Sequence, residues 1–375
     1  MILQKFGKFM FAISLVFFLA NNLFSKEHYY TLKNADIVKY DVTKKDTITT
    51  LIGNVDIIYD GINFFADNAQ LFTHQKMLKM SSNARAVDDT LRAKAEKVVY
   101  HHKNKFLHLE KNAVFIVQNS QNEKLKKISA DMVDYFKDDG RLAAKGNVSA
   151  YDFKENANLI CGDFAYDFME KYGTAKVDPI LTFERKNNIT IRSRQMEIFT
   201  NKNKFTATYD VSINMKNSLA EGNFLIYFKD DEEAVLIGHP NFSSETINAT
   251  ADEFHIFFSD ESLKNLHLIS NAKLNFKEKT GEKIIVDGKI QNKEKKENYL
   301  SAQKVFVELK NEKMSYLHAL NVSKSLIRQH KKTESDYFVN KLSTKDLEVF
   351  FDHNEKIQQV IAVGDISGVY KFLKK

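Results

Sequence analysis

Three histidines lie close together in the sequence, and histidine is the side chain that most often transfers protons or binds metals near neutral pH. They are His101, His102 and His108. In an extended strand, neighbouring residues point to opposite faces, so His101 and His102 would not share a ligand. The segment also lacks the His-Glu-x-x-His pattern of a zinc-binding helix. We therefore expect no metal site and no cofactor.

The segment 364–368 reads Gly-Asp-Ile-Ser-Gly and superficially resembles a nucleophile elbow. A true elbow has its serine in the third of five positions, whereas Ser367 occupies the fourth. Neither a Walker loop nor a dinucleotide fingerprint occurs elsewhere in the sequence. We predict that this segment is a strand and that the protein is not an enzyme.

Cys161 is the only cysteine, which excludes an intrachain disulfide and a cysteine-based zinc site. It does not follow the apolar N-terminal run directly, as a lipid-attachment cysteine would, so we predict a small buried side chain. Recurring Asp and Glu residues could suggest a row of calcium ligands. They lack the Gly-Gly-x-Gly-x-Asp context of calcium-binding repeats, which favours turn or strand-end hydrogen bonding instead.

Composition indicates one continuous folded body. Of the 375 residues, 43% are hydrophobic and 28% are charged, so apolar material for a core is ample. With only 2 prolines and 13 glycines, no Pro-rich or Gly-rich linker marks a domain boundary. The lysine clusters at 124–127 and 293–296 lie beside glutamates. They are typical of solvated loops, and we expect no nucleic-acid partner.

The N-terminus resembles an export signal. Lys5 and Lys8 precede an apolar run over 9–20, and a short polar segment follows. That run is shorter than the ~20 residues of a membrane span. We predict a signal peptide over 1–25 and a periplasmic mature protein. Because Leu23 and Phe24 are large for a cleavage site, an uncleaved inner-membrane anchor over 9–24 is the alternative.

The clearest signal is a repeat of about 30 residues that two series of positions follow in parallel. The first series is a small residue followed by a polar one, and the second is Asn or Asp before a small or β-branched residue. The sequence distance from a member of the first series to the next member of the second is nearly constant, as from 36 to 54, 67 to 83 and 131 to 147. The first series comprises Asp36, Asp67, Glu96, Asp131, Asp163 and Asp252, with weaker members Arg194, Gln303 and Lys345; the second comprises Asn54, Asn83, Asn112, Asn147, Asp210, Asn271, Asn321 and Asp365, with Asp178 and His239 in the same slot.

Apolar residues around each slot alternate with polar ones, as in Leu107, Leu109, Phe115 and Val117. Period two predicts strands with one buried and one wet face. One repeat cannot bury its apolar face alone, so about ten must stack into an elongated, repetitive, all-β body. We expect the repeat region to cover 26–276 and 299–375, with 277–298 as a charged insertion or irregular repeat.

Short motifs within this repeat resemble the LptA/OstA family. Leu51-Ile52-Gly53-Asn54-Val55-Asp56-Ile57 followed by Phe65-Ala66-Asp67-Asn68-Ala69 carries the resemblance, as does 128–148. The likeness is clearest over 35–150. It implies an antiparallel β-jellyroll shaped as a V-shaped trough with an apolar interior, through which lipopolysaccharide acyl chains travel. Such modules stack edge to edge with inner-membrane and outer-membrane components, and head-to-tail self-association is also implied.

The expected function is therefore a periplasmic lipid-binding bridge that carries lipopolysaccharide or a related acylated lipid from the inner to the outer membrane. A non-conducting structural or docking scaffold is the alternative. A glycan-acting parallel β-helix enzyme is disfavoured, because its coils are usually shorter. The inward aromatics could fill a closed core or line a trough. Our candidates for the lipid groove are Val55, Ile57, Phe65, Leu109, Phe115, Val148, Phe164, Val211, Phe242 and Phe276.

Overall fold

The structure, a computed structural model, describes residues 30–119, 121–184, 189–259, 262–277, 283–286, 289–292, 297–330 and 336–374. The predicted signal or anchor lies outside these residues. Within them, no helix has the length and apolar character needed to cross a membrane.

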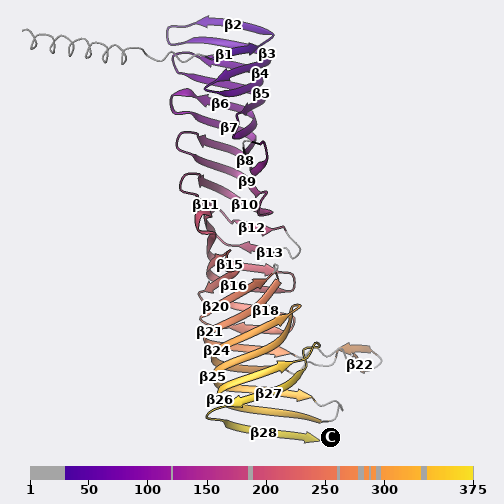
Figure 1. The fold of residues 1–375 in the computed structure, drawn as a ribbon. Coiled ribbons are helices and arrows are strands. Elements are labelled where there is room, and N and C mark those ends of the chain that lie inside the picture. Colours follow the sequence, from indigo (N-terminus) through magenta and orange to yellow (C-terminus); the bar gives the residue numbers. More distant parts are fainter. Residues whose placement is uncertain are drawn as a thin grey trace, which may run out of the picture.

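Antiparallel strands follow one another along an elongated stack, and 26 of them form one sheet (Figure 1). The all-β prediction is confirmed, and antiparallel pairing excludes the parallel β-helix. The first strands are β1 (Thr31–Asn34), β2 (Ile37–Val42), β3 (Thr47–Tyr59), β4 (Ile62–Phe72), β5 (Met77–Val87), β6 (Leu91–His101), β7 (Phe106–Gln118), β8 (Lys124–Phe136), β9 (Arg141–Asp152) and β10 (Ala157–Asp167).

In the middle of the stack, most layers consist of two shorter strands in place of one long strand. Strand β10 pairs with β11 through one half and with β12 through the other. The strands of this region are β11 (Tyr172–Lys176), β12 (Ile180–Phe183), β13 (Ile189–Arg192), β14 (Gln195–Phe199), β15 (Lys204–Met215), β16 (Ser218–Phe228), β17 (Glu233–Ile237), β18 (Asn241–Ser244), β19 (Ile247–Thr250) and β20 (Glu253–Ser259). Among these described strands, only β15 and β16 are long.

Long strands return towards the C-terminus, and a small hairpin stands apart from the main sheet. The hairpin strands β22 and β23 pair only with each other and lie within 277–298 (Figure 1). Two short 3-10 turns, η1 (His102–Asn104) and η2 (Thr200–Lys202), complete the described elements. The strands are β21 (Ser262–Lys277), β22 (Lys283–Val286), β23 (Lys289–Asn292), β24 (Glu297–Lys310), β25 (Lys313–His330), β26 (Asp336–Phe351), β27 (Ile357–Val363) and β28 (Ser367–Lys374).

Each layer is divided into two halves by a bulge near its centre. In β3, residues 47–52 pair with β2, residues 56–58 pair with β1, and the register shifts between Ile52 and Val55. We call the halves stacked on 55–59 wing A and the halves stacked on 47–52 wing B. A bulge bends its strand and increases the local twist, so a row of bulges makes one sheet into two facing wings.

The second series of sequence positions marks these bulges. Every member has a positive φ, for example 48° at Asn54 and at Asn147 and 50° at Asp365. Asn and Asp tolerate this left-handed conformation better than other residues with a Cβ, which explains their recurrence. Both prolines of the chain, Pro179 and Pro240, directly follow such a position. In the segment 364–368, predicted as a strand, residues 364–366 form the bulge between β27 and β28, whereas Ser367 and Gly368 begin β28.

The two series bond to each other across neighbouring strands. The Asn147 amide donates to Asp131 at 2.9 Å, and Asn83 donates to Asp67 at 2.8 Å. A Cβ on Gly146, whose φ is 74°, would approach Asp131 Oδ2 to 2.3 Å, so a larger residue there would displace the Asp131 side chain. Equivalent pairs are Asn54–Asp36, Asn112–Glu96, Asn271–Asp252, Asn321–Gln303, Arg194–Asp210 and Lys345–Asp365.

Inward side chains of the two wings form one apolar cluster along the stack. Aromatic rings meet across it: Phe115 of wing A lies 4.8 Å from Tyr135 of wing B, and Phe276 lies 5.8 Å from Phe351, measured between ring centroids. Burial of such side chains drives association of the wings, at ~25 cal/mol per Å² of apolar surface. The core therefore lies between the wings and not within a single sheet.

Candidate functional site

Nine of the ten predicted groove residues lie in the interior between the wings. Their exposed fractions range from 0% at Ile57 to 8% at Phe164. The nine are Val55, Ile57, Leu109, Phe115, Val148, Phe164, Val211, Phe242 and Phe276. Phe164 lines one cavity and Phe242 another, and the other seven belong to the apolar core between the wings.

The prediction for Phe65 is wrong. Its neighbour Phe64 is fully buried, whereas Phe65 is half-buried on the outer face and Arg85 packs over its ring, 5.4 Å from the centroid. Side chains alternate along a strand, and Ala66 is buried, so Phe64 shares its inward face and Phe65 does not. Because Phe64 and Phe65 are adjacent and both apolar, an alternating pattern can be drawn through either of them. The sequence alone therefore did not show which one points inward.

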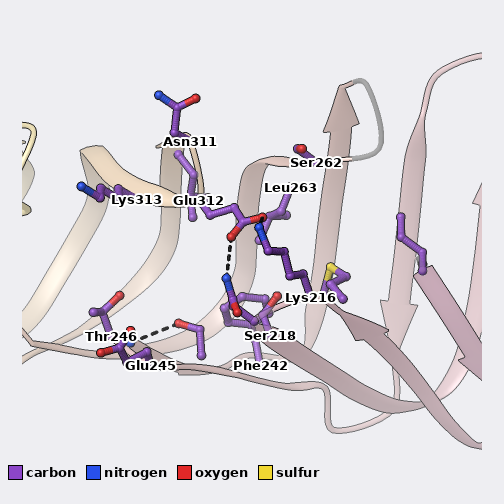
Figure 2. Close-up of a pocket in the computed structure, with 15 residues that line it drawn as sticks. Lys216, Ser218, Phe242, Glu245, Thr246, Ser262, Leu263, Asn311, Glu312 and Lys313 are labelled. Carbon is purple, nitrogen blue, oxygen red and sulfur yellow. Dashed lines mark hydrogen bonds and ion pairs between the residues drawn. The ribbon is translucent and has the colours of Figure 1, made fainter. Parts of the chain in front are cut away.

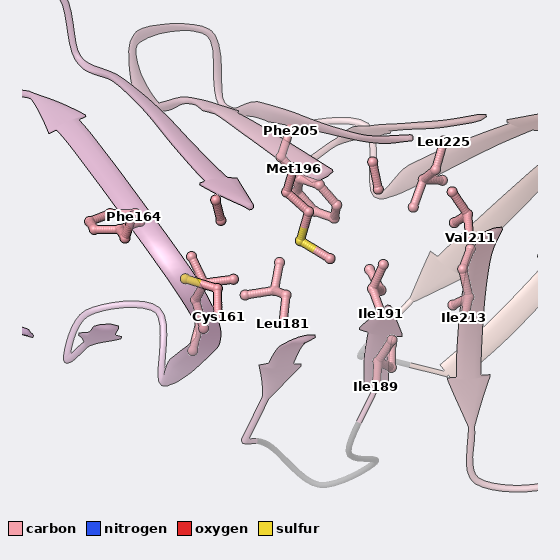
Figure 3. Packing of buried hydrophobic residues seen from close by; sticks show 14 of the residues in the cluster. Cys161, Phe164, Leu181, Ile189, Ile191, Met196, Phe205, Val211, Ile213 and Leu225 are labelled. Carbon is pink, nitrogen blue, oxygen red and sulfur yellow. The ribbon is translucent and has the colours of Figure 1, made fainter. Parts of the chain in front are cut away.

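A cavity of about 470 Å³ lies between the wings in the middle of the stack; we call it the central cavity. This volume is in the range of small-molecule binding sites. Figure 3 shows side chains of both wings facing one another here, including Phe164, Leu181, Ile191 and Phe205. The apolar lining includes Ile128, Leu159, Phe164, Tyr166, Phe168, Leu181, Phe183, Ile189, Ile191, Ile198, Phe199, Phe205, Ile213, Tyr227 and Phe258.

The central cavity reaches the strand turns at the edges of both wings. We call the space between the turns of wing A and those of wing B the mouth. At the mouth, Lys229 Nζ of wing B lies 2.7 Å from Glu155 Oε2 of wing A. Within wing A, Lys126 pairs with Asp152. Lys154 of wing A and Lys204 of wing B also line the cavity. The site thus combines an apolar interior with a charged rim.

A second cavity of about 260 Å³ lies at the mouth nearer the C-terminus (Figure 2). Ile189 lines both cavities, so they adjoin. The second cavity is more polar. There the Asn217 amide donates to Glu312 at 2.6 Å across the mouth, and Lys216 lies 3.9 Å from the same carboxylate.

The N-terminal part of the mouth is closed by polar contacts between the wings. The Tyr100 hydroxyl donates to Asp60 at 2.7 Å, and His102 Nδ1 lies 2.5 Å from the same oxygen. Tyr59 stacks on His102, and its burial, with the charge of Asp60, raises the pKa of Tyr59 to about 12. Further along the mouth, Lys137, in the turn after β8, donates to Asp88, in the turn after β5, at 2.6 Å.

The Asp88 carboxylate is nearly buried, with an exposed fraction of 8%. Burial acts to raise its pKa, but hydrogen bonds from Lys137 and Thr90 outweigh burial and lower the pKa. Near the C-terminus, Thr246 donates to Glu355 at 3.3 Å across the mouth, and the Met314 backbone N–H donates to the same oxygen at 3.1 Å. The mouth is therefore closed on both sides of the two cavities.

The histidines singled out in the sequence do not converge. His102 contacts Asp60, His108 lies 2.5 Å from Asp134 on the outer face, and His101 stacks on Phe106. No group of three or more ligating side chains occurs within the described ranges. Cys161 is buried in the interior as predicted, and this burial raises its pKa to about 12.

Sequence reasoning missed most of the central cavity, including Leu181, Ile191 and Phe205. Their strands are only four or five residues long or adjoin short strands, so alternation was too brief to stand out. Asp178-Pro179 could have indicated this region, because it separates β11 from β12 and so divides one layer into two short strands.

The fold and this interior define a class: an elongated, two-winged antiparallel β protein with an apolar cavity that reaches the edges of both wings. Residues 34–141 match the family described as "LptA/(LptD N-terminal domain) LPS transport protein". The resemblance to the LptA/OstA family is thus confirmed over that segment, which spans β2 to β8.

Among solved structures, this chain is similar to the crystal structure of LptH from Pseudomonas aeruginosa. That protein is described as the LptA homologous periplasmic component of the conserved lipopolysaccharide transport device. Identity is 13%, the match covers 28% of this chain and 76% of LptH, and the TM-score is 0.26. No curated protein matches this chain by sequence.

Proposed function

We propose that this protein is a periplasmic lipid-binding bridge that carries lipopolysaccharide or a related acylated lipid from the inner to the outer membrane. The observation that carries the proposal is the central cavity, whose apolar lining comes from both wings of a chain with a lipopolysaccharide-transport family segment. Each acyl CH₂ transferred from water to such a lining gains about 0.8 kcal/mol. A charged rim beside an apolar interior suits a lipid with a polar head.

Both ends of the stack support docking to other envelope components by strand addition. At the N-terminal end, β2 is exposed throughout, with Tyr40 69% and Val42 82% exposed. At the C-terminal end, Val369 and Tyr370 of β28 are about half exposed. An open edge offers unpaired N–H and C=O groups to another strand. Inner-membrane and outer-membrane components, or a second copy of this chain, are the proposed partners.

A non-conducting scaffold remains the second candidate, and the filled core favours it. Ile57, Leu109 and Phe254 are completely buried, so the interior is sealed at these levels. The two candidates differ in what the central cavity holds: a lipid chain in the first, and nothing in the second.

Photo-crosslinking in cells tests the proposal. Benzoylphenylalanine replaces Phe164, which lines the central cavity, or Phe65, which faces outward and serves as the matched control. After irradiation, we expect an adduct with lipopolysaccharide or another acylated lipid at Phe164 and none at Phe65. Equal adducts at both positions, or none at Phe164 in a protein that is folded and exported, would favour the scaffold.

A further inference from the structure

The mouth of the central cavity is closed at one point by an ion pair between the wings. Glu155 lies in the turn between β9 and β10 of wing A, and Lys229 lies in the turn after β16 of wing B. Both residues line the central cavity, and their charged atoms are 2.7 Å apart. The side chains are 26% and 46% exposed, so solvent and solutes can reach the pair.

The closed regions on either side leave this mouth as the way into the cavity. Towards the N-terminus, Asp60 and Asp88 each bond to the opposite wing, and the core there is filled. Towards the C-terminus, Thr246 bonds to Glu355, and Phe276 packs against Phe351. A chain that travelled along the interior from either end would have to separate these contacts and displace core side chains.

The rim chemistry indicates how the mouth would open. Lys229 is paired with a carboxylate of the opposite wing, and Lys126 is paired with Asp152 of its own wing. An anionic group arriving from solvent would offer Lys229 the same charge and hydrogen-bond acceptors as Glu155 does. An exchange of one anion for another costs little, because partly exposed ion pairs contribute little to stability.

We propose that lipid enters sideways, at the middle of the molecule, and that its anionic headgroup displaces Glu155 from Lys229 while the acyl chain enters the central cavity. Glu155 and Lys229 are positioning residues in this scheme: they hold the wings together until a headgroup takes the place of the carboxylate. The inference rests on the proposed lipid-binding function and adds the route of access and the class of headgroup.

Charge specificity is tested with two fluorescent acyl probes, cis-parinaric acid and its uncharged methyl ester, at pH 8 with the purified mature chain. Glu155→Gln removes the competing anion, and we expect about two- to five-fold tighter binding of the acid with no change for the ester. Lys229→Met should weaken binding of the acid only. Asp138→Asn breaks an exposed ion pair with Lys105, away from the cavity, and should change neither probe.

The route is tested by locking the mouth with a short bis-maleimide in a Cys161→Ala background. Glu155→Cys with Lys229→Cys ties the wings at the central cavity, and Asp88→Cys with Lys137→Cys ties them where they are already closed. We expect the first lock to slow or abolish probe uptake and the second to leave it unchanged. Circular dichroism verifies that each variant is folded.

The possible outcomes separate the two claims. If the unlocked wild-type chain binds neither probe, both the proposed function and this inference fail. If it binds probes but acid and ester respond alike to Glu155→Gln, the headgroup exchange is overturned. If both locks block uptake equally, lipid passes along the interior from an end and sideways access is overturned, while lipid binding stands.

Discussion

Arg194 donates its guanidinium Nε–H to Asp210 at 2.6 Å, in the same place where other layers have an asparagine bonded to an acid. At Asp131 and Asn147 the acid occupies the first position and the left-handed bulge is an asparagine. At Arg194 and Asp210 the order is reversed: the cation is first and the acid occupies the bulge. Lys345 and Asp365 repeat the reversed order. These layers therefore share a polar bond between the two positions, and either member of the pair can carry the negative charge.

This reversal predicts that the acid can be moved from the bulge position, Asp210, to the first position, Arg194, without loss of stability. Arg194→Asp alone places two carboxylates together and should lower stability by about 0.2–1 kcal/mol, because the site is exposed. Adding Asp210→Asn recreates the arrangement of Asp131 and Asn147 and should restore the loss. Urea unfolding followed by circular dichroism measures both variants. A double variant no more stable than Arg194→Asp would contradict the interpretation.

Phe64 and Phe65 provide a matched pair for the assignment of faces. Phe64→Ala removes a completely buried ring and should cost about 3–5 kcal/mol. Phe65→Ala removes only an outer ring that packs against Arg85, and we expect a loss of about 1 kcal/mol or less. The comparison requires only the unfolding midpoints of the two variants. Similar losses would mean that the faces of β4 are wrongly assigned.

The contact between Asp88 and Lys137 should make closure of the N-terminal mouth sensitive to acid. Because the folded-state pKa of Asp88 is lowered, its contribution is present above the unfolded value, near 4, and is lost as pH falls through the folded pKa. Asp88→Asn should cost about 1–3 kcal/mol at pH 7, and the difference from wild type should shrink below about pH 4. Unfolding midpoints across this pH range measure it. Asp138→Asn, in an exposed ion pair, is the control and should lower stability less than Asp88→Asn at pH 7.

Cys161 should resist alkylation in the folded protein. With a pKa of about 12 and an exposed fraction of 5%, it is about 10⁻⁴ ionised at pH 8 and is also shielded from reagents. We expect slow reaction with iodoacetamide in buffer and rapid reaction in urea, with mass spectrometry to count the modified chains. Equally fast labelling in both would place the thiol in solvent and contradict the packing of β10.

The bulges could be predicted from sequence because their backbone conformation restricts the residue type. Left-handed φ values favour Asn, Asp and Gly, so Asn147 and its equivalents recur visibly at nearly constant spacing. The inward faces followed from alternation except at Phe64 and Phe65, where both residues are apolar.

The cavity and the cross-mouth contacts were not predictable in the same way. Glu155 and Lys229 lie in turns of distant layers and opposite wings, and no local pattern in the sequence encodes their meeting. Leu181 and Ile191 lie in short strands beside an interrupted layer, where alternation is too brief to identify them as a cavity lining.

The cross-mouth contacts also impose an order on chain folding. The N-terminal pairs join residues 42 and 49 positions apart, whereas the two towards the C-terminus join residues 95 and 109 positions apart. A chain that emerges N-terminus first can close its first layers when little more than a quarter of it is available. The last layers must wait for nearly all of it. Nascent molecules would therefore acquire protection from proteases progressively from the N-terminal end, with the C-terminal layers the last to be secured.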